Sequence, residues 1–185
     1  GVPGVQGIHV EGPFLNPARK GIHDPAMLRR IDDAAIALLS RPRRGRVLVT
    51  IAPELAPPGA VAALAAAGVV IAAGHSDASY EQAVAAFDAG ITGATHLFNA
   101  MSPLQSRAPG LVGAILDDDR VTAGIIVDGH HVHPAALRVA LRAKSAERLM
   151  LVSDAMPTTG GDADDFTLNG RVIHLRDGRL TDASG

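Results

Sequence analysis

The chain contains no cysteine and no tryptophan among its 185 residues, and only one tyrosine and four phenylalanines. The lack of cysteine excludes disulfides, thiolate metal sites and cysteine nucleophiles within this stretch, and it fits a cytoplasmic protein. With so few aromatic residues, the apolar content comes mainly from Ala, Val, Leu and Ile, which favours packed α/β layers over an aromatic-rich sandwich. The length is sufficient for one compact domain with its own core.

Neither charge nor hydrophobicity is concentrated in a way that indicates a nucleic-acid or membrane partner. Lys and Arg number 17 against 19 Asp and Glu, so the formal charge is −2 and provides no general attraction for a phosphate backbone. The longest apolar stretch, from Val61 to Ala73, is interrupted by Gly68 and falls short of the roughly 20 residues of a membrane span. No charged segment followed by an apolar one opens the chain, so we expect no signal peptide.

Short apolar segments alternate with helix-like segments along most of the chain. The helix-like segments carry start signals: Pro134 suits a first helical position, and Ser79 with Gln82 fits a capping box. An aspartate–proline pair, Asp24-Pro25, marks another helix start. The expected strands are 5–10, 46–51, 69–73, 92–95, 121–127 and 149–153, and the expected helices are 24–39, 60–67, 79–90, 110–116 and 134–144.

This alternation predicts an α/β fold with a parallel sheet. Six strands cannot close an eight-stranded barrel, so a barrel needs about two further strands from elsewhere. An open doubly wound sheet is the structural alternative. We predict an incomplete TIM-like (β/α)8 barrel over residues 1–160, with about six of its eight βα units.

In the last part of the chain, residues 161–185, short strand-like segments follow one another without helix-like segments between them. Three short strand-like segments, 166–168, 171–175 and 179–181, are separated by Asn169-Gly170 and Asp177-Gly178. Both dipeptides are strong signals for tight hairpin turns. We therefore expect a small antiparallel, hairpin-like β element that leads into a flanking region outside the barrel.

Four side chains suited to metal-assisted hydrolysis each stand where an expected strand stops. They are Glu11, His75, His96 and Asp154. In a barrel of parallel strands, the carboxyl ends converge on one face, which is where such folds carry out chemistry. Two imidazoles and one carboxylate can bind a transition metal, and the further carboxylate can move protons.

Five short motifs around these residues follow one another in a recognisable order. Each is weak alone, but the five together with their spacing form a specific pattern. They are His9-Val10-Glu11-Gly12-Pro13-Phe14, Gly74-His75-Ser76, Thr95-His96-Leu97-Phe98-Asn99-Ala100-Met101, Asp128-Gly129-His130-His131 and Ser153-Asp154-Ala155-Met156.

On these motifs the chain resembles the N-acetylglucosamine-6-phosphate deacetylases of the amidohydrolase superfamily, from about Gly7 to Gly161. Members of that family are longer, so the resemblance implies that this chain is a central portion. The six strands would then be the third to eighth of the barrel.

The resemblance implies that Glu11, His75 and His96 are metal ligands. Neutral imidazole and carboxylate groups suit Zn²⁺ best among the ions considered, with Fe²⁺, Mn²⁺ or Cd²⁺ as alternatives. Many amidohydrolases hold a metal with a His-x-His pair on the first barrel strand. That strand is not among these residues, so the number of ions, one or two, stays open.

The resemblance also implies the remaining roles. Asp154 would be the catalytic proton carrier. His131 and His23 would contact the sugar. Arg107, with the amide groups around Asn99 and Ala100, would bind the phosphate, since a guanidinium grips phosphate at two points. In this family the arginine reaches the active site of a partner subunit, so a homodimer is expected.

The activity implied by the resemblance is hydrolysis of the acetamide of N-acetylglucosamine 6-phosphate to glucosamine 6-phosphate and acetate, a step of amino-sugar catabolism. Two alternatives remain open. Another amidohydrolase could act on a cyclic amide or a nucleobase. Arg107, Asn99 and His131 separate the two, because a phosphosugar needs anion-binding groups and a nucleobase does not. Alternatively, the chain could be a catalytically silent binding or structural fragment of such an enzyme.

Overall fold

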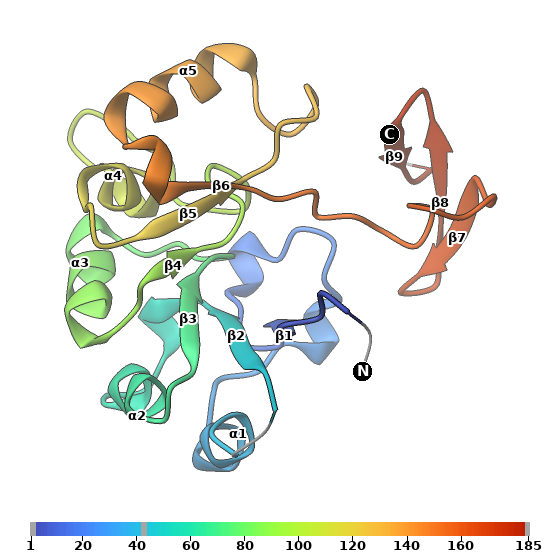
Figure 1. Ribbon diagram of the computed structural model, residues 1–185. Coiled ribbons are helices and arrows are strands. Elements are labelled where there is room, and N and C mark those ends of the chain that lie inside the picture. Colours follow the sequence, from blue (N-terminus) through green and yellow to red (C-terminus); the bar gives the residue numbers. More distant parts are fainter. Residues whose placement is uncertain (1–2, 42–43, 184–185) are drawn as a thin grey trace.

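Six parallel strands form the main sheet of the computed structural model, which describes residues 3–41 and 44–183 (Figure 1). Each strand pairs with its successor in the chain, and the sheet curls as the strands follow one another. This arrangement is a half-barrel, as predicted, and not the doubly wound alternative. The strands are β1 (Gly7–Glu11), β2 (Arg46–Ile51), β3 (Val70–Ala73), β4 (Gly93–Ala94), β5 (Thr122–Ile125) and β6 (Leu149–Leu151).

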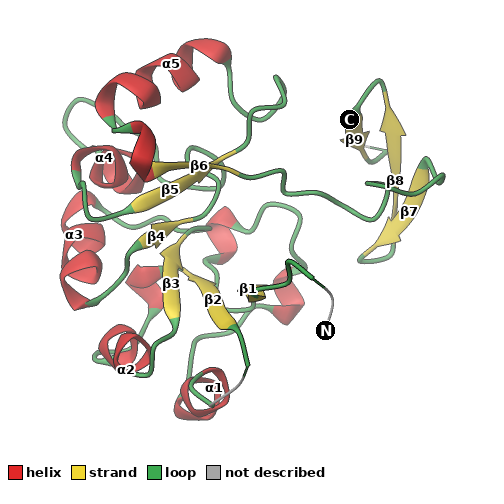
Figure 2. Ribbon diagram, viewed as in Figure 1, coloured by secondary structure: helices red, strands yellow, loops and turns green. Residues whose placement is uncertain are grey.

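Five α-helices cover the outer face of the curled sheet (Figure 2). Each contacts the next one along the chain, as expected for successive βα units. The α-helices are α1 (Asp33–Leu39), α2 (Ala60–Ala66), α3 (Tyr80–Ala89), α4 (Gly110–Asp117) and α5 (Pro134–Ala143), and the 3-10 turns are η1 (Pro17–Arg19), η2 (Pro25–Met27), η3 (Pro53–Leu55) and η4 (Ala146–Arg148). None of the helices in the described ranges is long and apolar enough to cross a membrane.

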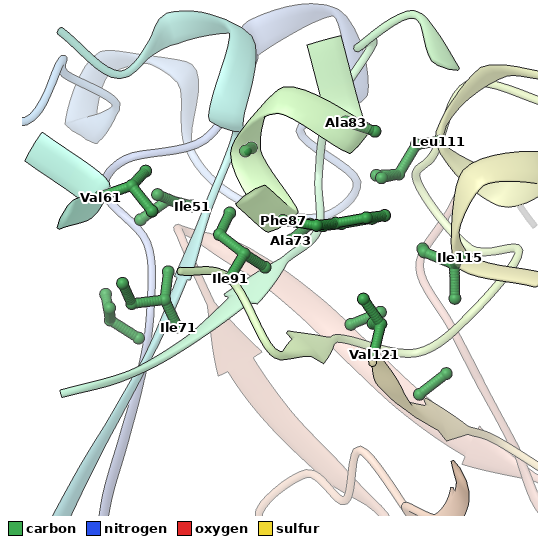
Figure 3. Close-up of a cluster of buried hydrophobic side chains, with 14 of the residues drawn as sticks. Ile51, Val61, Ile71, Ala73, Ala83, Phe87, Ile91, Leu111, Ile115 and Val121 are labelled. Atoms are coloured by element: carbon green, nitrogen blue, oxygen red, sulfur yellow. The ribbon is translucent and has the colours of Figure 1, made fainter. Parts of the chain in front are cut away.

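The core lies between the outer face of the sheet and these helices (Figure 3). Alternate residues of a strand point to the same face, so Ile71 and Ala73 of β3 both face the helices. They join Phe87 of α3 and Ile115 of α4, all of which are almost completely buried. Burial of this apolar surface holds the helices on the sheet and fixes where each strand ends.

Two of the predicted helix starts are present in the structure. Ser79 and Gln82 form the reciprocal hydrogen bonds of a capping box at the start of α3. His133 caps α5, its Nδ1 accepting the backbone N–H of Ala135 at 3.1 Å, and Pro134 occupies the first turn. These local signals therefore place the two helices that follow the carboxyl ends of β3 and β5.

The predicted helix over residues 24–39 is wrong in its first half. Asp24 caps only the single turn η2, after which Leu28 is extended, with φ −77° and ψ 138°. Helix α1 begins later, where Asp32 accepts the backbone N–H of Ala35 at 2.8 Å and also pairs with Arg29. The segment therefore holds two N-cap aspartates, and the second one starts the α-helix.

The small C-terminal sheet forms as the sequence predicts. Strands β7 (Asp165–Leu168), β8 (Arg171–Arg176) and β9 (Arg179–Thr181) pair antiparallel in chain order. Asn169-Gly170 and Asp177-Gly178 all have φ between 49° and 76°, which a type I′ hairpin turn requires. The Asn169 side-chain amide donates to the carbonyl of Ile22 at 3.1 Å, so this sheet touches the loop that follows β1.

Candidate active site

Three side chains meet at the carboxyl ends of neighbouring strands. Glu11 is the last residue of β1, and His75 and His96 follow β3 and β4 by two residues each. The parallel pairing in register brings these strand ends together across distances of 64 and 85 residues in the chain. This convergence is the one that the strand-end pattern predicts.

The donor atoms of this cluster lie within hydrogen-bond distance of one another. Nε2 of His75 and Nε2 of His96 each lie 2.9 Å from the same oxygen, Oε1 of Glu11, and 3.0 Å from each other. The side chains are 6%, 5% and 22% exposed in the order His75, His96 and Glu11. Three ligand atoms therefore converge from buried or half-buried side chains, as in a metal site.

The donor chemistry fits a divalent transition metal. The Nδ1 atom of His75 lies 2.8 Å from the carbonyl oxygen of Arg19, so Nδ1 carries the proton and Nε2 presents a lone pair in the neutral ring. The Nε2 atoms of His75 and His96 lie 3.0 Å apart, so they can either share one proton or turn both lone pairs toward one cation.

The cluster also perturbs the titration of its members. Burial alone would raise the pKa of the Glu11 carboxyl, but the imidazoles of His75 and His96 beside it lower it far below its usual range. Burial lowers the pKa of His96, yet the hydrogen bond and charge of Glu11, with the charge of Asp154, outweigh this effect and raise it. Glu11 is therefore held as a carboxylate, the form that binds a cation.

The backbone is left-handed at several of these positions. His75, His96 and Asp154 have φ of 47°, 33° and 51°, a conformation that is uncommon for residues other than Gly, although Asn, Asp and His adopt it more often than the rest. Each such residue costs about 1–3 kcal/mol and persists only where its surroundings impose it, typically at functional sites. The strain therefore coincides with the three strand ends that turn their side chains toward the site.

A chain of hydrogen bonds lies beneath the cluster on the inner face of the sheet. Nε2 of His9 lies 2.7 Å from Oγ1 of Thr50, which lies 2.7 Å from Oγ1 of Thr95. A Cβ at Gly74 would come within 2.9 Å of both threonine side chains, so glycine is required there for the strand end to approach them. His9 is thus engaged below the cluster, as its position two residues before Glu11 predicts.

A cavity of about 620 Å³ opens above the cluster. Of the residues expected to contact substrate, His23, Asn99, Ala100 and His131 line it, together with Asp154. Arg107 does not line the cavity; it is exposed on the loop before α4. The structure therefore brings all but one of the predicted site residues to one cavity.

Two histidines of the cavity wall, His23 and His131, are held by different neighbours. The ring of His23 meets the ring of His75 edge-on, with centroids 4.8 Å apart. Burial and then the charge of His75 lower the pKa of His23, so its imidazole is neutral at neutral pH. His131 is exposed. Its Nδ1 lies 2.6 Å from Oδ2 of Asp128, and its backbone N–H donates to Oδ1 of the same carboxylate at 2.9 Å. Asp128 thus fixes the orientation of the His131 ring.

The segment after His96 forms part of the cavity wall through Asn99 and Ala100. Ala100 has φ 51°, and its carbonyl accepts the backbone N–H of Ser76 at 3.1 Å, which ties this segment to the end of β3. The backbone N–H of Asn99 donates to the carbonyl of His96 at 3.0 Å. The donor that Asn99 can offer to a bound anion is therefore its side-chain amide.

Several residues of the site were not singled out from the sequence. Leu168 and Asn169 of the β7–β8 turn line the cavity, although Asn169-Gly170 signals only a hairpin turn. Met156 lines it from the motif that contains Asp154. Leu168 and Asn169 reach the cavity because the small sheet contacts the loop after β1, and no local sequence pattern predicts that contact.

Comparison with known proteins identifies the family to which the chain belongs. Residues 3–175 match the model of the Amidohydrolase family. An N-acetylgalactosamine-6-phosphate deacetylase from Shewanella sp. (strain ANA-3) is 46% identical over 93% of this chain, and an N-acetylglucosamine-6-phosphate deacetylase from Haemophilus influenzae is 39% identical over 96% of it.

Solved structures give the same result. The crystal structure of N-acetylglucosamine-6-phosphate deacetylase from Pasteurella multocida matches all of this chain with a TM-score of 0.92 and 36% identity. A mutant of the Mycobacterium smegmatis enzyme, solved in complex with N-acetyl-D-glucosamine-6-phosphate, matches 98% of this chain with a TM-score of 0.87 and 41% identity.

The chain spans about half the length of these relatives: 44% of the Shewanella enzyme and 47% of the Haemophilus enzyme, and 48% of each of the two solved chains. The residues that match the family model, 3–175, contain both the half-barrel and the cluster of Glu11, His75 and His96 at its strand ends. The chain therefore belongs to the amidohydrolase family.

Proposed function

We propose that the natural protein carrying this chain hydrolyses the acetamide of N-acetylglucosamine 6-phosphate to glucosamine 6-phosphate and acetate, in amino-sugar catabolism. The observation that carries the proposal is the convergence of Glu11, His75 and His96 at the floor of a cavity that Asp154 also lines. The names of relatives at 39% and 46% identity support a phosphorylated N-acetyl amino sugar as the substrate class.

Glu11, His75 and His96 would hold the metal. Two imidazoles and a carboxylate suit Zn²⁺ first, with Fe²⁺, Mn²⁺ or Cd²⁺ as alternatives, and one or two ions per site. When bound, such an ion makes water nucleophilic at neutral pH and polarises the acetyl carbonyl. The hydrogen bond between His75 and Arg19 prepares the ring for this role because it leaves Nε2 unprotonated.

Asp154 would move the proton of the reaction. Its carboxylate takes a proton from the water that adds to the acetyl carbon, and it returns that proton to the sugar nitrogen as the C–N bond breaks. Acetate and the free amine are the products. General acid–base catalysis of this kind typically contributes about 10²–10⁴-fold to the rate. The exposed position of Asp154 on the cavity wall gives it access to both atoms.

The remaining residues would hold the sugar. His131, oriented by Asp128, and the neutral ring of His23 are placed to bond the amide and hydroxyl groups of a sugar in the cavity. Asn99 and Ala100 lie on the same wall and would contact the phosphate. Arg107 lies outside the cavity of its own chain, which is compatible with a reach into the site of a partner subunit in a homodimer.

One observation favours a second substrate. The relative at 46% identity is named an N-acetylgalactosamine-6-phosphate deacetylase, and its substrate differs from the first only in the configuration of one hydroxyl. The same cluster and the same proton carrier serve either epimer. We therefore propose the galactosamine epimer as the second candidate.

Three further predictions accompany the proposal: a homodimer, a cytoplasmic location and a domain boundary after residue 160. The separate pairing of the strands in residues 165–181 supports this boundary. The family resemblance supports the homodimer.

Acetate release tests the proposed function. The natural protein, loaded with zinc, is incubated with each of the two epimers and with unphosphorylated N-acetylglucosamine. We expect acetate from at least one phosphorylated epimer, little from the unphosphorylated sugar, and none after metal removal by a chelator. Turnover that survives complete metal removal, or an equal rate without the phosphate, would refute the proposal.

A further inference from the structure

Glu54 is a carboxylate outside the cavity that joins the loops after β1, β2 and β3. It lies in η3, directly after β2. Its Oε1 accepts the side-chain amide of Asn16 at 2.9 Å and the backbone N–H of Asp77 at 2.7 Å. Its Oε2 accepts the hydroxyl of Ser76 at 2.7 Å. One side chain thus receives three hydrogen bonds from two loops that are distant in the sequence.

The bond to Asn16 continues toward the metal cluster. Oδ1 of Asn16 accepts the backbone N–H of Ala18 at 2.9 Å and thereby caps η1. The last residue of this turn is Arg19, whose carbonyl lies 2.8 Å from Nδ1 of His75. Since a capped turn holds its carbonyls in place, Asn16 determines where the acceptor for His75 lies.

The other loop returns to the same histidine. Ser76 and Asp77, which donate to Glu54, follow His75 directly in the chain. The backbone N–H of Asn16 donates to the carbonyl of His75 at 2.9 Å, and the Arg19 guanidinium pairs with Asp77 at 2.8 Å. The backbone and the ring of His75 are therefore both fixed by groups connected to Glu54.

From this network we infer that Glu54 is a positioning residue for the metal site: it sets the orientation and tautomer of His75 through Asn16 and η1. The inference rests on the metal-binding part of the proposed function. Glu54 is absent from the wall of the cavity, so it acts through other residues and does not touch the substrate. Ligand orientation by outer groups of this kind typically affects metal affinity by about 10–100-fold.

The hydrogen bonds identify what a replacement must retain. A glutamine at position 54 can keep its oxygen on Asn16 and Asp77 and donate its amide to the hydroxyl of Ser76, which is able to accept. An alanine loses all three bonds. Glu54→Gln is therefore the conservative variant that should rescue the metal site, and Glu54→Ala the variant that should damage it.

The test measures the affinity of the natural protein for Zn²⁺ alone, by competition with a chromophoric chelator, without substrate. A visible absorption spectrum of the Co²⁺-loaded protein reports the ligand geometry in the same samples. Asp32→Ala is the matched control, because it removes a carboxylate that caps α1 and pairs with Arg29 away from the cluster. Asn16→Ala and the double variant Glu54→Ala/Asn16→Ala complete a double-mutant cycle, which measures the coupling between the two residues.

We expect Zn²⁺ affinity to fall about 10-fold in Glu54→Ala and in Asn16→Ala, with a changed Co²⁺ spectrum. The double variant should be little worse than Glu54→Ala alone, because Asn16 acts through η1 and Glu54 acts through η1 and through Ser76 and Asp77. Glu54→Gln and Asp32→Ala should bind as the unaltered protein does. Equal affinity and spectra in Glu54→Ala and the unaltered protein would overturn the inference while leaving the proposed function intact.

If Glu54→Ala does not fold, the inference is tested by the Zn²⁺ affinities of Asn16→Ala and Glu54→Gln. An affinity unchanged in Asn16→Ala overturns the inference. An unaltered protein that binds no Zn²⁺ would refute the metal site itself, and with it both the inference and the proposed function.

Discussion

The two sides of the cavity differ in how firmly their polar side chains are held. On the side of β1 to β4, His75 and His96 are 6% and 5% exposed, and the first of them is oriented by Arg19. On the side of β5 and β6, the His131 side chain is 52% exposed and Asp154 is also exposed. His131 has a fixing contact in Asp128.

This difference matches the different demands of the two roles. Metal ligands must hold their geometry within a fraction of an ångström, and this requires side chains locked by packing and by outer hydrogen bonds. The proton carrier Asp154 and the sugar-contacting His131 must instead reach a ligand that enters and leaves. The account therefore separates metal binding, on the firm side, from turnover, on the exposed side, and variants on each side should affect one before the other.

The largest effect is expected on the firm side. His75→Ala removes a ligand atom, so the loss of metal affinity should exceed the roughly 10–100-fold that loss of an outer partner costs. Turnover should disappear with the metal. Elemental analysis of the purified protein provides the measurement. His133→Ala is the control, since it removes only the cap of α5 and should retain the metal. Retention of stoichiometric metal in His75→Ala would remove this residue from the ligand set.

On the exposed side, Asp154→Asn should separate the two functions. The change keeps size and shape but abolishes proton transfer, so kcat should fall by about 10²–10⁴-fold while metal content stays the same. Acetate release and elemental analysis on one preparation measure both. Asp162→Asn, in the exposed loop that follows, is the control. Near-normal turnover in Asp154→Asn would exclude Asp154 as the proton carrier.

Arg107→Ala should have a smaller and more selective effect. If the guanidinium binds the phosphate, its loss should raise KM for the phosphorylated sugar by about 10–100-fold, the range expected for a charge-assisted hydrogen bond. KM for the unphosphorylated sugar should change little. Arg138→Ala, at an exposed position of α5, serves as the control. Equal effects on both sugars would contradict the phosphate role.

The smallest effect on the site is expected from Lys144, which belongs to the core. This lysine is 2% exposed, and its ammonium donates to the carbonyls of Ile115 and Asp118 at the end of α4. Lys144→Met leaves these carbonyls unpaired and should lower the free energy of unfolding by about 1–3 kcal/mol. Urea unfolding measures the change, with Arg142→Met as the surface control. A change in zinc affinity would show that the two regions are coupled.

The sequence predicts the parts of this molecule that are encoded locally. The capping residues of α3 and the two Asn-Gly and Asp-Gly turns act over a few residues, and both are present where expected. The convergence of Glu11 with His75 also follows from the sequence, because parallel strands bring their carboxyl ends to one face whatever the intervening segments contain.

What the sequence did not predict depends on distant contacts. Glu54 resembles any acidic residue after a strand, and its partners Asn16 and Ser76 lie 38 and 22 residues away. The left-handed backbone of His75 does not follow from the residue type alone, because histidine is enriched in this conformation but adopts others far more often. The start of α1 was wrong because Asp24 and Asp32 both satisfy the pattern for an N-cap, and only the tertiary structure distinguishes them.

The most direct test of the account is the zinc X-ray absorption spectrum of the metal-loaded natural protein. The account predicts a first shell of nitrogen and oxygen at about 2.0–2.2 Å, with the outer scattering of two imidazole rings from His75 and His96, and the loss of one ring in His75→Ala. Stoichiometric zinc without imidazole scattering, or a spectrum unchanged in His75→Ala, would contradict the metal site at the ends of β1, β3 and β4.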